Sequence, residues 1–154
     1  MIHVDETVAE ARKDGRPAGS ESRMWVYRSG ELEPNPVILY EYQKTQKKEH
    51  AHEFLKGFSG ICVTDGYQGY HSIAGEREDL TIAGCWSHAR RGFADVVKAA
   101  GKKERNIRES IAYKSLQLIQ TMSRQEEELA NREPAGRLEA RIHHVLPLAA
   151  PFFA

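Results

Sequence analysis

Residues 63–70, VTDGYQGY, join the end of an apolar run to an aspartate and then to two Gly-Tyr pairs. The apolar run at 61–63 followed by Asp-Gly predicts a β-strand that ends in a turn, with Asp65 at its carboxyl end. Asp is also common in turns for its own sake, because its side chain binds the backbone two residues further on. Tyr67 and Tyr70 are expected to pack in the core or to hydrogen-bond at its rim. Asp65 taken alone therefore fits either a turn former or a working acid.

A second run with the same pattern lies at the start of the chain. Residues 2–4 are apolar apart from His3, and they lead directly to Asp5. Both runs predict strands that end in an acid. A fold that sets these two strands side by side would bring Asp5 and Asp65 together, although they are 60 residues apart in the sequence.

Apolar alternation and helical spacing predict the remaining elements: strands at 24–28, 37–42 and 80–85, and helices at 47–55, 86–100 and 105–131. The apolar stripe of the last helix is expected to contain Ile107, Ile111, Leu118, Ile119 and Met122. The strands at 24–28 and 37–42 flank a loop with Gly and Pro, which predicts a hairpin. The order of elements indicates an α/β fold, and one topology with this order is the ribonuclease-H-like mixed sheet with flanking helices. In that topology the first and fourth strands are neighbours.

Bulk composition limits the possible classes of function. A chain of 154 residues is long enough for one domain with a core. Its 22 basic and 22 acidic residues give no overall basic field, so any contact with nucleic acid must come from local patches. Two cysteines, no signal segment and no long apolar run indicate a reduced, soluble, cytoplasmic protein.

The expected pair of acids has a definite chemistry. Two carboxylates within a few ångströms repel each other, and a divalent cation removes this conflict. Mg²⁺ is usually held by one or two carboxylates together with substrate phosphate, and two such ions promote in-line phosphoryl displacement. We therefore predict that Asp5 and Asp65 are metal ligands and catalytic residues, with Mg²⁺ or Mn²⁺ as the cofactor, for cleavage and joining of phosphodiesters.

Four ordered motifs carry a resemblance to a known family: HVDET at 3–7, MWVYRSG at 24–30, VTDGYQGY at 63–70 and AGCWSHARRGF at 83–93. In this order they resemble the central catalytic domain of insertion-sequence-66 family transposases, which use two aspartates and a glutamate. The resemblance implies that Asp5 is the first catalytic acid and Asp65 the second. It implies a third acid on a later helix, which we do not find in this sequence and expect beyond it.

The resemblance also implies partners and a domain organisation. DNA is the expected substrate, as transposon ends and as target, and a homo-oligomer is expected for the full-length protein, with no membrane partner. We expect a catalytic core over 1–100 and a helical extension over 101–154 that stops before the third acid. A chain with two of three acids is expected to be inactive in isolation. The three glutamates at 126–128 fit a solvated helix face better than a replacement site.

Candidate DNA contacts follow the strand at 80–85. Arg90 and Arg91 could bind phosphate and give affinity without sequence choice, although each alone fits an ordinary surface arginine equally well. The resemblance of the HARR stretch favours a DNA-binding role that includes His88. Cys85 and His88 also have zinc-ligand spacing, but with Cys62 they make three candidates where a structural site needs four.

Two other functions remain open. A catalytically dead ribonuclease-H-like module that binds DNA or a protein partner fits the zero net charge and the missing third acid. A small-molecule phosphohydrolase that uses the same acids is less well supported, because the chain has no phosphate-binding loop of the G-x-x-x-x-G-K-[ST] kind.

Overall fold

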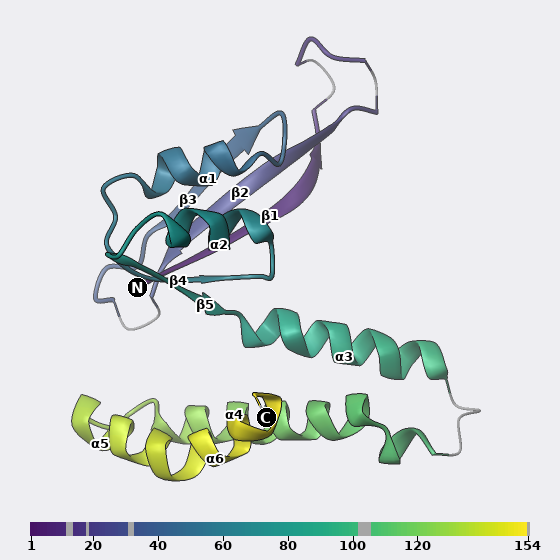
Figure 1. Cartoon of the computed structure of the whole chain (residues 1–154), viewed down its shortest axis with the longest axis vertical. Coiled ribbons are helices and arrows are strands. Elements are labelled where there is room, and N and C mark those ends of the chain that lie inside the picture. The colour runs from purple at the N-terminus through teal and green to yellow at the C-terminus, as the bar shows by residue number, and fades with distance from the viewer. Residues whose placement is uncertain (12–13, 18, 31–32, 102–105, 154) are drawn as a thin grey trace. The chain divides into compact units, whose positions relative to one another are not determined.

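The computed structural model describes residues 1–11, 14–17, 19–30, 33–101 and 106–153. The chain forms two compact units, Met1–Cys85, which contains the sheet, and Trp86–Ala154, which is helical (Figure 1). The mixed α/β class predicted from the sequence is confirmed. Within the described ranges, every helix is too short or too polar to cross a bilayer.

The first unit is built on a five-stranded mixed sheet in the order β3-β2-β1-β4-β5. Its elements in chain order are β1 (Ile2–Glu10), β2 (Glu21–Ser29), β3 (Ile38–Gln43), α1 (Lys48–Leu55), β4 (Gly60–Thr64), α2 (Gln68–Gly75) and β5 (Leu80–Gly84). The predicted hairpin is the antiparallel pair of β2 and β3. The first and fourth strands are neighbours, as expected, and β1, β4 and β5 run parallel.

β1 is longer than its apolar start predicts. All nine of its residues have antiparallel partners in β2, from Ile2 opposite Ser29 to Glu10 opposite Glu21. This pairing satisfies the backbone of the polar residues that follow Asp5, so the strand continues through them. Asp5 therefore lies inside β1 and not at its end.

The core of the first unit lies on one face of the sheet, under α1 and α2 (Figure 1). Its buried residues are Val4, Trp25, Tyr27, Cys62 and Leu80 from the strands, with Ala51, Leu55, Tyr70 and Ile73 from the helices. Trp25 and Tyr70 are fully buried and meet edge to face, with ring centroids 6.2 Å apart. Because successive side chains of a strand alternate between faces, Asp5 points away from this core while Val4 and Glu6 point towards it.

α2 was not predicted from the sequence. Its eight residues include Gly69 and Gly75, and glycine is the weakest helix former after proline. Gly69 is required by packing, because a Cβ atom there would lie 2.4 Å from Cε1 of Tyr67. The helix is stabilised by burying Tyr70 and Ile73 against the sheet, which local propensity does not reveal.

The second unit consists of helices: α3 (Trp86–Ala100), η1 (Ile107–Glu109), α4 (Ile111–Leu129), α5 (Pro134–Ala140), η2 (Arg141–Val145), α6 (Leu146–Ala149) and η3 (Ala150–Phe152). The predicted helix at 86–100 is confirmed at both ends. Figure 1 shows α5 and α6 following α4 back along its length, an arrangement that the sequence did not predict. Trp86 packs on Phe152 with ring centroids 5.2 Å apart, so it is an aromatic anchor within this unit.

α4 corresponds to the long amphipathic helix predicted over 105–131. Ser110 caps its first turn by accepting a hydrogen bond from the backbone N–H of Tyr113. The buried stripe is Ala112, Ser115, Ile119, Met122 and Leu129. The prediction for Ile111 was wrong, since this first helical residue is 80% exposed.

Candidate active site

The parallel pairing of β1 with β4 sets the positions of the two candidate acids. Ile2 pairs with Cys62 and His3 pairs with Val63, so partners differ by 60 in residue number. Asp5 and Asp65 differ by the same 60. Both acids therefore lie two residues beyond the last pair of the ladder, Asp5 within β1 and Asp65 directly after β4. Neighbouring strands are about 4.8 Å apart, so both acids follow the same end of the ladder, and alternation along β1 gives Asp5 the face opposite the core.

The backbone around each acid orients one of its oxygens. Oδ1 of Asp65 accepts a hydrogen bond from the backbone N–H of Tyr67 at 2.9 Å, which closes the turn into α2. Oδ1 of Asp5 accepts from the backbone N–H of Glu6 at 3.0 Å. Asp65 is thus a turn former, as its sequence alone allowed, and this role uses only one of its two oxygens.

Glu6 lies at the centre of a polar network that the sequence did not single out. Its Oε2 accepts from the hydroxyl of Tyr70 at 2.7 Å, and its Oε1 accepts from the side-chain amide of Gln46 at 2.8 Å. Tyr67 completes the network by donating its hydroxyl to the carbonyl of Gln46 at 2.7 Å. Burial, followed by the bond to the Glu6 carboxylate, raises the pKa of Tyr70 far above its ordinary value. Both tyrosines are structural, as expected.

The signal for Glu6 was its place in the strand. It directly follows Asp5, so alternation sends it to the core face, where a lone carboxylate needs a hydrogen-bond donor. The donor is Tyr70, a residue 64 positions away that only the fold brings near.

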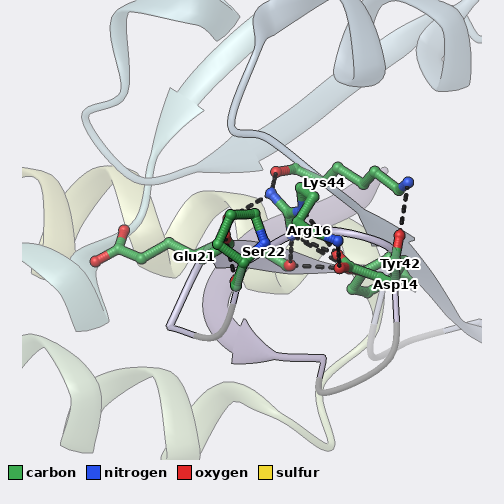
Figure 2. Close-up of polar contacts among 8 residues, drawn as sticks. Asp14, Arg16, Glu21, Ser22, Tyr42 and Lys44 are labelled. Carbon is green, nitrogen blue, oxygen red and sulfur yellow. Dashed lines mark hydrogen bonds and ion pairs between the residues drawn. The ribbon is translucent and has the colours of Figure 1, made fainter.

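A second polar network holds Asp14 and Arg16, which lie between β1 and β2, against the start of β2 and the end of β3 (Figure 2). The guanidinium of Arg16 donates to oxygens from three segments, namely those of Asp14, Glu21, Ser22, Tyr42 and Lys44. Tyr42 also donates to Asp14 at 2.6 Å. The bonds from Arg16 and then from Tyr42 hold the pKa of the Asp14 carboxyl well below its usual value. Because these contacts are all internal, we assign Arg16 a structural role.

The candidate DNA-binding residues lie on α3, in the second unit. Arg90 and Arg91 are exposed, and His88 is half-buried. Residues three apart share a helix face, so His88 and Arg91 lie on one side of α3 and Arg90 on another. The two arginines are accessible to a phosphate, each from its own side.

Two residues considered above as alternative ligands, Glu126 and Cys62, have structural roles. Arg141 forms a two-pronged ion pair with Glu126, with Nε 2.8 Å from Oε1 and Nη2 2.7 Å from Oε2, which ties η2 to α4. Cys62 is fully buried, and this burial raises the pKa of its thiol to about 11. Among the residues that the structure describes, no three His, Cys, Asp or Glu side chains are grouped so that they could hold a metal ion. The candidate centre thus rests on the two acids selected from the sequence, Asp5 and Asp65.

Comparison with known proteins gives a family and several relatives. The family described as Transposase IS66 family matches residues 1–154. Two relatives come from Sinorhizobium fredii (strain NBRC 101917 / NGR234). Uncharacterized protein y4qI is 28% identical over 163 residues, which cover 99% of this chain and 29% of the relative. Uncharacterized protein y4jD is 30% identical over 112 residues, which cover 67% of this chain and 22% of the relative. The chain thus spans less than a third of these relatives, and no solved structure matches it.

Proposed function

This chain belongs to the IS66 family of transposases, and we propose that it carries a catalytic core for metal-dependent cleavage and transfer of DNA strands. The observation that carries the proposal is the parallel ladder of β1 and β4, which ends at His3 and Val63, two residues before Asp5 and Asp65. The strand order β3-β2-β1-β4-β5, antiparallel on one side of β1 and parallel on the other, supports a ribonuclease-H-like fold for the sheet. Residues 1–100 form the proposed core, because the motif at 83–93 runs from β5 into α3.

The residues present fit a hard divalent cation. Asp5 in β1 and Asp65 directly after the neighbouring β4 offer carboxylate oxygens, and each carboxylate is oriented by a backbone N–H. Mg²⁺ and Mn²⁺ accept such a ligand set and complete it with water and substrate phosphate. When bound, the cation would neutralise charge on the phosphate and activate the attacking oxygen. The contribution of the chain is to hold both carboxylates in place, through the β1–β4 ladder and the turn at Asp65.

The network around Glu6 supports this positioning. Tyr70 joins α2 to β1, and α2 begins directly after the turn that Asp65 closes. Movement of α2 would therefore displace Asp65 relative to Asp5. The fully buried Tyr70 would thus help to fix the segments that carry Asp5 and Asp65 before metal or DNA binds.

DNA is the proposed substrate, as transposon ends and as target. We assign phosphate contacts to Arg90 and Arg91, which are exposed, and to His88, which shares a face of α3 with Arg91. Because two carboxylates and no third ligand are found in the described part of the chain, we propose that the chain alone holds metal without performing strand transfer. The alternative is a catalytically dead module that binds DNA or a protein, and the balanced charge of 22 against 22 favours it.

Calorimetric titration with Mn²⁺ tests the proposal. The parent is expected to bind the ion, and Asp65→Asn is expected to lose binding, because asparagine keeps the turn acceptor but not the charge. Asp95→Asn makes the same change at an exposed residue of α3 and should bind like the parent. If Asp65→Asn binds as well as the parent, or if the parent binds no Mn²⁺, the metal-dependent core is rejected in favour of the dead module.

A further inference from the structure

Two tyrosines of β3 lie on the face of the sheet opposite the core. Val26 pairs with Asp5 on one side and with Tyr40 on the other, and paired residues share a face. Tyr40 therefore lies on the face that carries Asp5, and Tyr42, two residues further along β3, shares it. The helices α1 and α2 pack on the other face (Figure 1). Both tyrosine rings thus lie on a face that these helices leave open.

Both rings are exposed, and one of them is fixed. Tyr42 is 38% exposed, and its hydroxyl donates to Asp14 at 2.6 Å and shares a hydrogen bond of 2.8 Å with Ser22 (Figure 2). Tyr40 is 69% exposed. Residues two apart in a strand are separated by about 6.8 Å, at about 3.4 Å per residue. The pair therefore offers two neighbouring aromatic surfaces to solvent, and the Tyr42 ring is held in place by its hydroxyl.

A cation lies at each end of this aromatic pair. Arg28 is exposed and shares the face, because it is two residues after Val26 in β2. Lys44 follows β3 at the other end, is exposed, and donates its Nζ to the carbonyl of Asp14 at 3.0 Å (Figure 2). The carboxylate of Asp14 is already neutralised by Arg16, 2.7 Å away. The even-numbered residues of β2 and β3, which form this part of the face, include no acid, so its charge is positive.

We propose that this surface, formed by Arg28, Tyr40, Tyr42 and Lys44, binds single-stranded DNA, a proposal that rests on the proposed function for the choice of DNA. Unpaired bases stack on the two tyrosine rings, and the two cations contact the phosphates on either side. Proteins that bind single strands combine basic residues that follow the backbone with aromatic side chains on which successive bases stack. We call this surface the tyrosine platform.

The platform favours a single strand over a duplex. In a duplex the faces of the bases are stacked on one another, so an aromatic side chain reaches them only where the strands separate. An exposed ring such as that of Tyr40 therefore contributes little to binding a duplex. Cations alone contact the phosphates of either form. The two tyrosines are thus the residues that distinguish the two kinds of DNA.

The platform lies close to one of the candidate catalytic acids. Tyr40 and Asp5 belong to the same row across β3, β2 and β1, so their backbones are two strand spacings apart, about 10 Å. A strand bound to the platform would therefore lie on the face that carries Asp5. We infer that the candidate centre receives DNA whose strands are separated next to the reacting phosphate.

Fluorescence anisotropy of a labelled oligothymidine tests the platform, with EDTA present so that binding does not depend on metal. The parent should bind this oligonucleotide more tightly than a hairpin duplex. Tyr40→Ala should weaken binding of the single strand by about 10-fold, since stacking contributes about 1–3 kcal/mol per base, and should leave duplex binding unchanged. Tyr40→Phe keeps the ring and should bind like the parent. Phe153→Ala, which removes a ring that is 79% exposed in the second unit, should also bind like the parent.

Circular dichroism of each variant separates loss of stacking from loss of structure, and Tyr40→Phe controls for the site itself. A parent with no affinity for oligothymidine, or a folded Tyr40→Ala variant that binds it as well as the parent, would overturn the proposal. Tighter binding of an oligouridine of the same length would overturn the assignment to DNA. Because the titration contains no metal, Asp65→Asn should retain single-strand binding. A parent that binds Mn²⁺ but no oligothymidine would overturn the platform and leave the proposed metal centre standing.

Discussion

The buried hydroxyl of Tyr70 donates a hydrogen bond to the carboxylate of Glu6 at 2.7 Å, which joins α2 to β1. Glu6 is next to Asp5, and α2 follows the turn closed by Asp65. This one contact therefore links the segments that carry both candidate acids.

Removing the Tyr70 hydroxyl should destabilise the sheet unit. Tyr70→Phe keeps the ring packed on Trp25 but leaves the Glu6 carboxylate without its donor from α2. A hydrogen bond to a charged group contributes about 1.5–3 kcal/mol, so we expect the free energy of unfolding in urea to fall by about 2 kcal/mol. Thr81→Val, which removes the hydroxyl of an exposed residue in β5, should change it by less than about 0.5 kcal/mol. Equal effects of the two changes would refute the structural role of the bond.

The two glycines of α2 should respond in opposite directions to alanine. Gly69→Ala places a Cβ 2.4 Å from the Tyr67 ring, and overpacking of this kind costs about 1–3 kcal/mol. Gly75→Ala meets no atom within 4 Å and should gain up to about 1 kcal/mol of helix propensity. Urea unfolding of both variants measures the contrast. A Gly69→Ala variant as stable as Gly75→Ala would show that the Tyr67 ring is not fixed against α2.

Acid should weaken the Arg16 network through Asp14. The pKa of Asp14 in the folded chain lies well below its ordinary value of 3.8, because Arg16 and Tyr42 donate to the carboxylate. A carboxyl group with a lowered folded pKa stabilises the fold above its unfolded pKa, and that stabilisation is lost as the pH falls below it towards the folded pKa. Lowering the pH from 6 to 2 should therefore reduce the urea midpoint more in the parent than in Asp14→Asn. Parallel pH profiles would exclude this contribution.

Local sequence patterns predicted the elements that are specified by residues close together in the sequence. Alternation and the Gly/Pro loop gave the hairpin of β2 and β3, and helical spacing gave α3. Local patterns did not predict the polar half of β1, because its residues are extended by pairing with β2 and not by their own propensity. The helix α2 was missed for a related reason, since Gly69 weakens its local signal while the burial of Tyr70 stabilises it.

The candidate site also combines residues that local sequence patterns reveal with contacts that only the folded chain supplies. Two apolar runs that each lead to an acid were enough to select Asp5 and Asp65, because strand-to-acid patterns are visible locally. The ladder that makes their strands neighbours, from Ile2 opposite Cys62 to His3 opposite Val63, is supplied only by the fold. Glu6 needed both the alternation of β1 and the position of Tyr70, so sequence patterns could not assign its partner.

The most direct test of the account counts Mn²⁺ bound per chain, by electron paramagnetic resonance of the free ion, in the parent, Asp5→Asn, Asp65→Asn and the double variant. If both carboxylates hold the same ion, the parent retains bound Mn²⁺, and each single variant loses it as completely as the double variant does. Independent losses, with each single variant keeping part of the binding and the double variant keeping none, would contradict a shared site, as would a parent that binds no Mn²⁺.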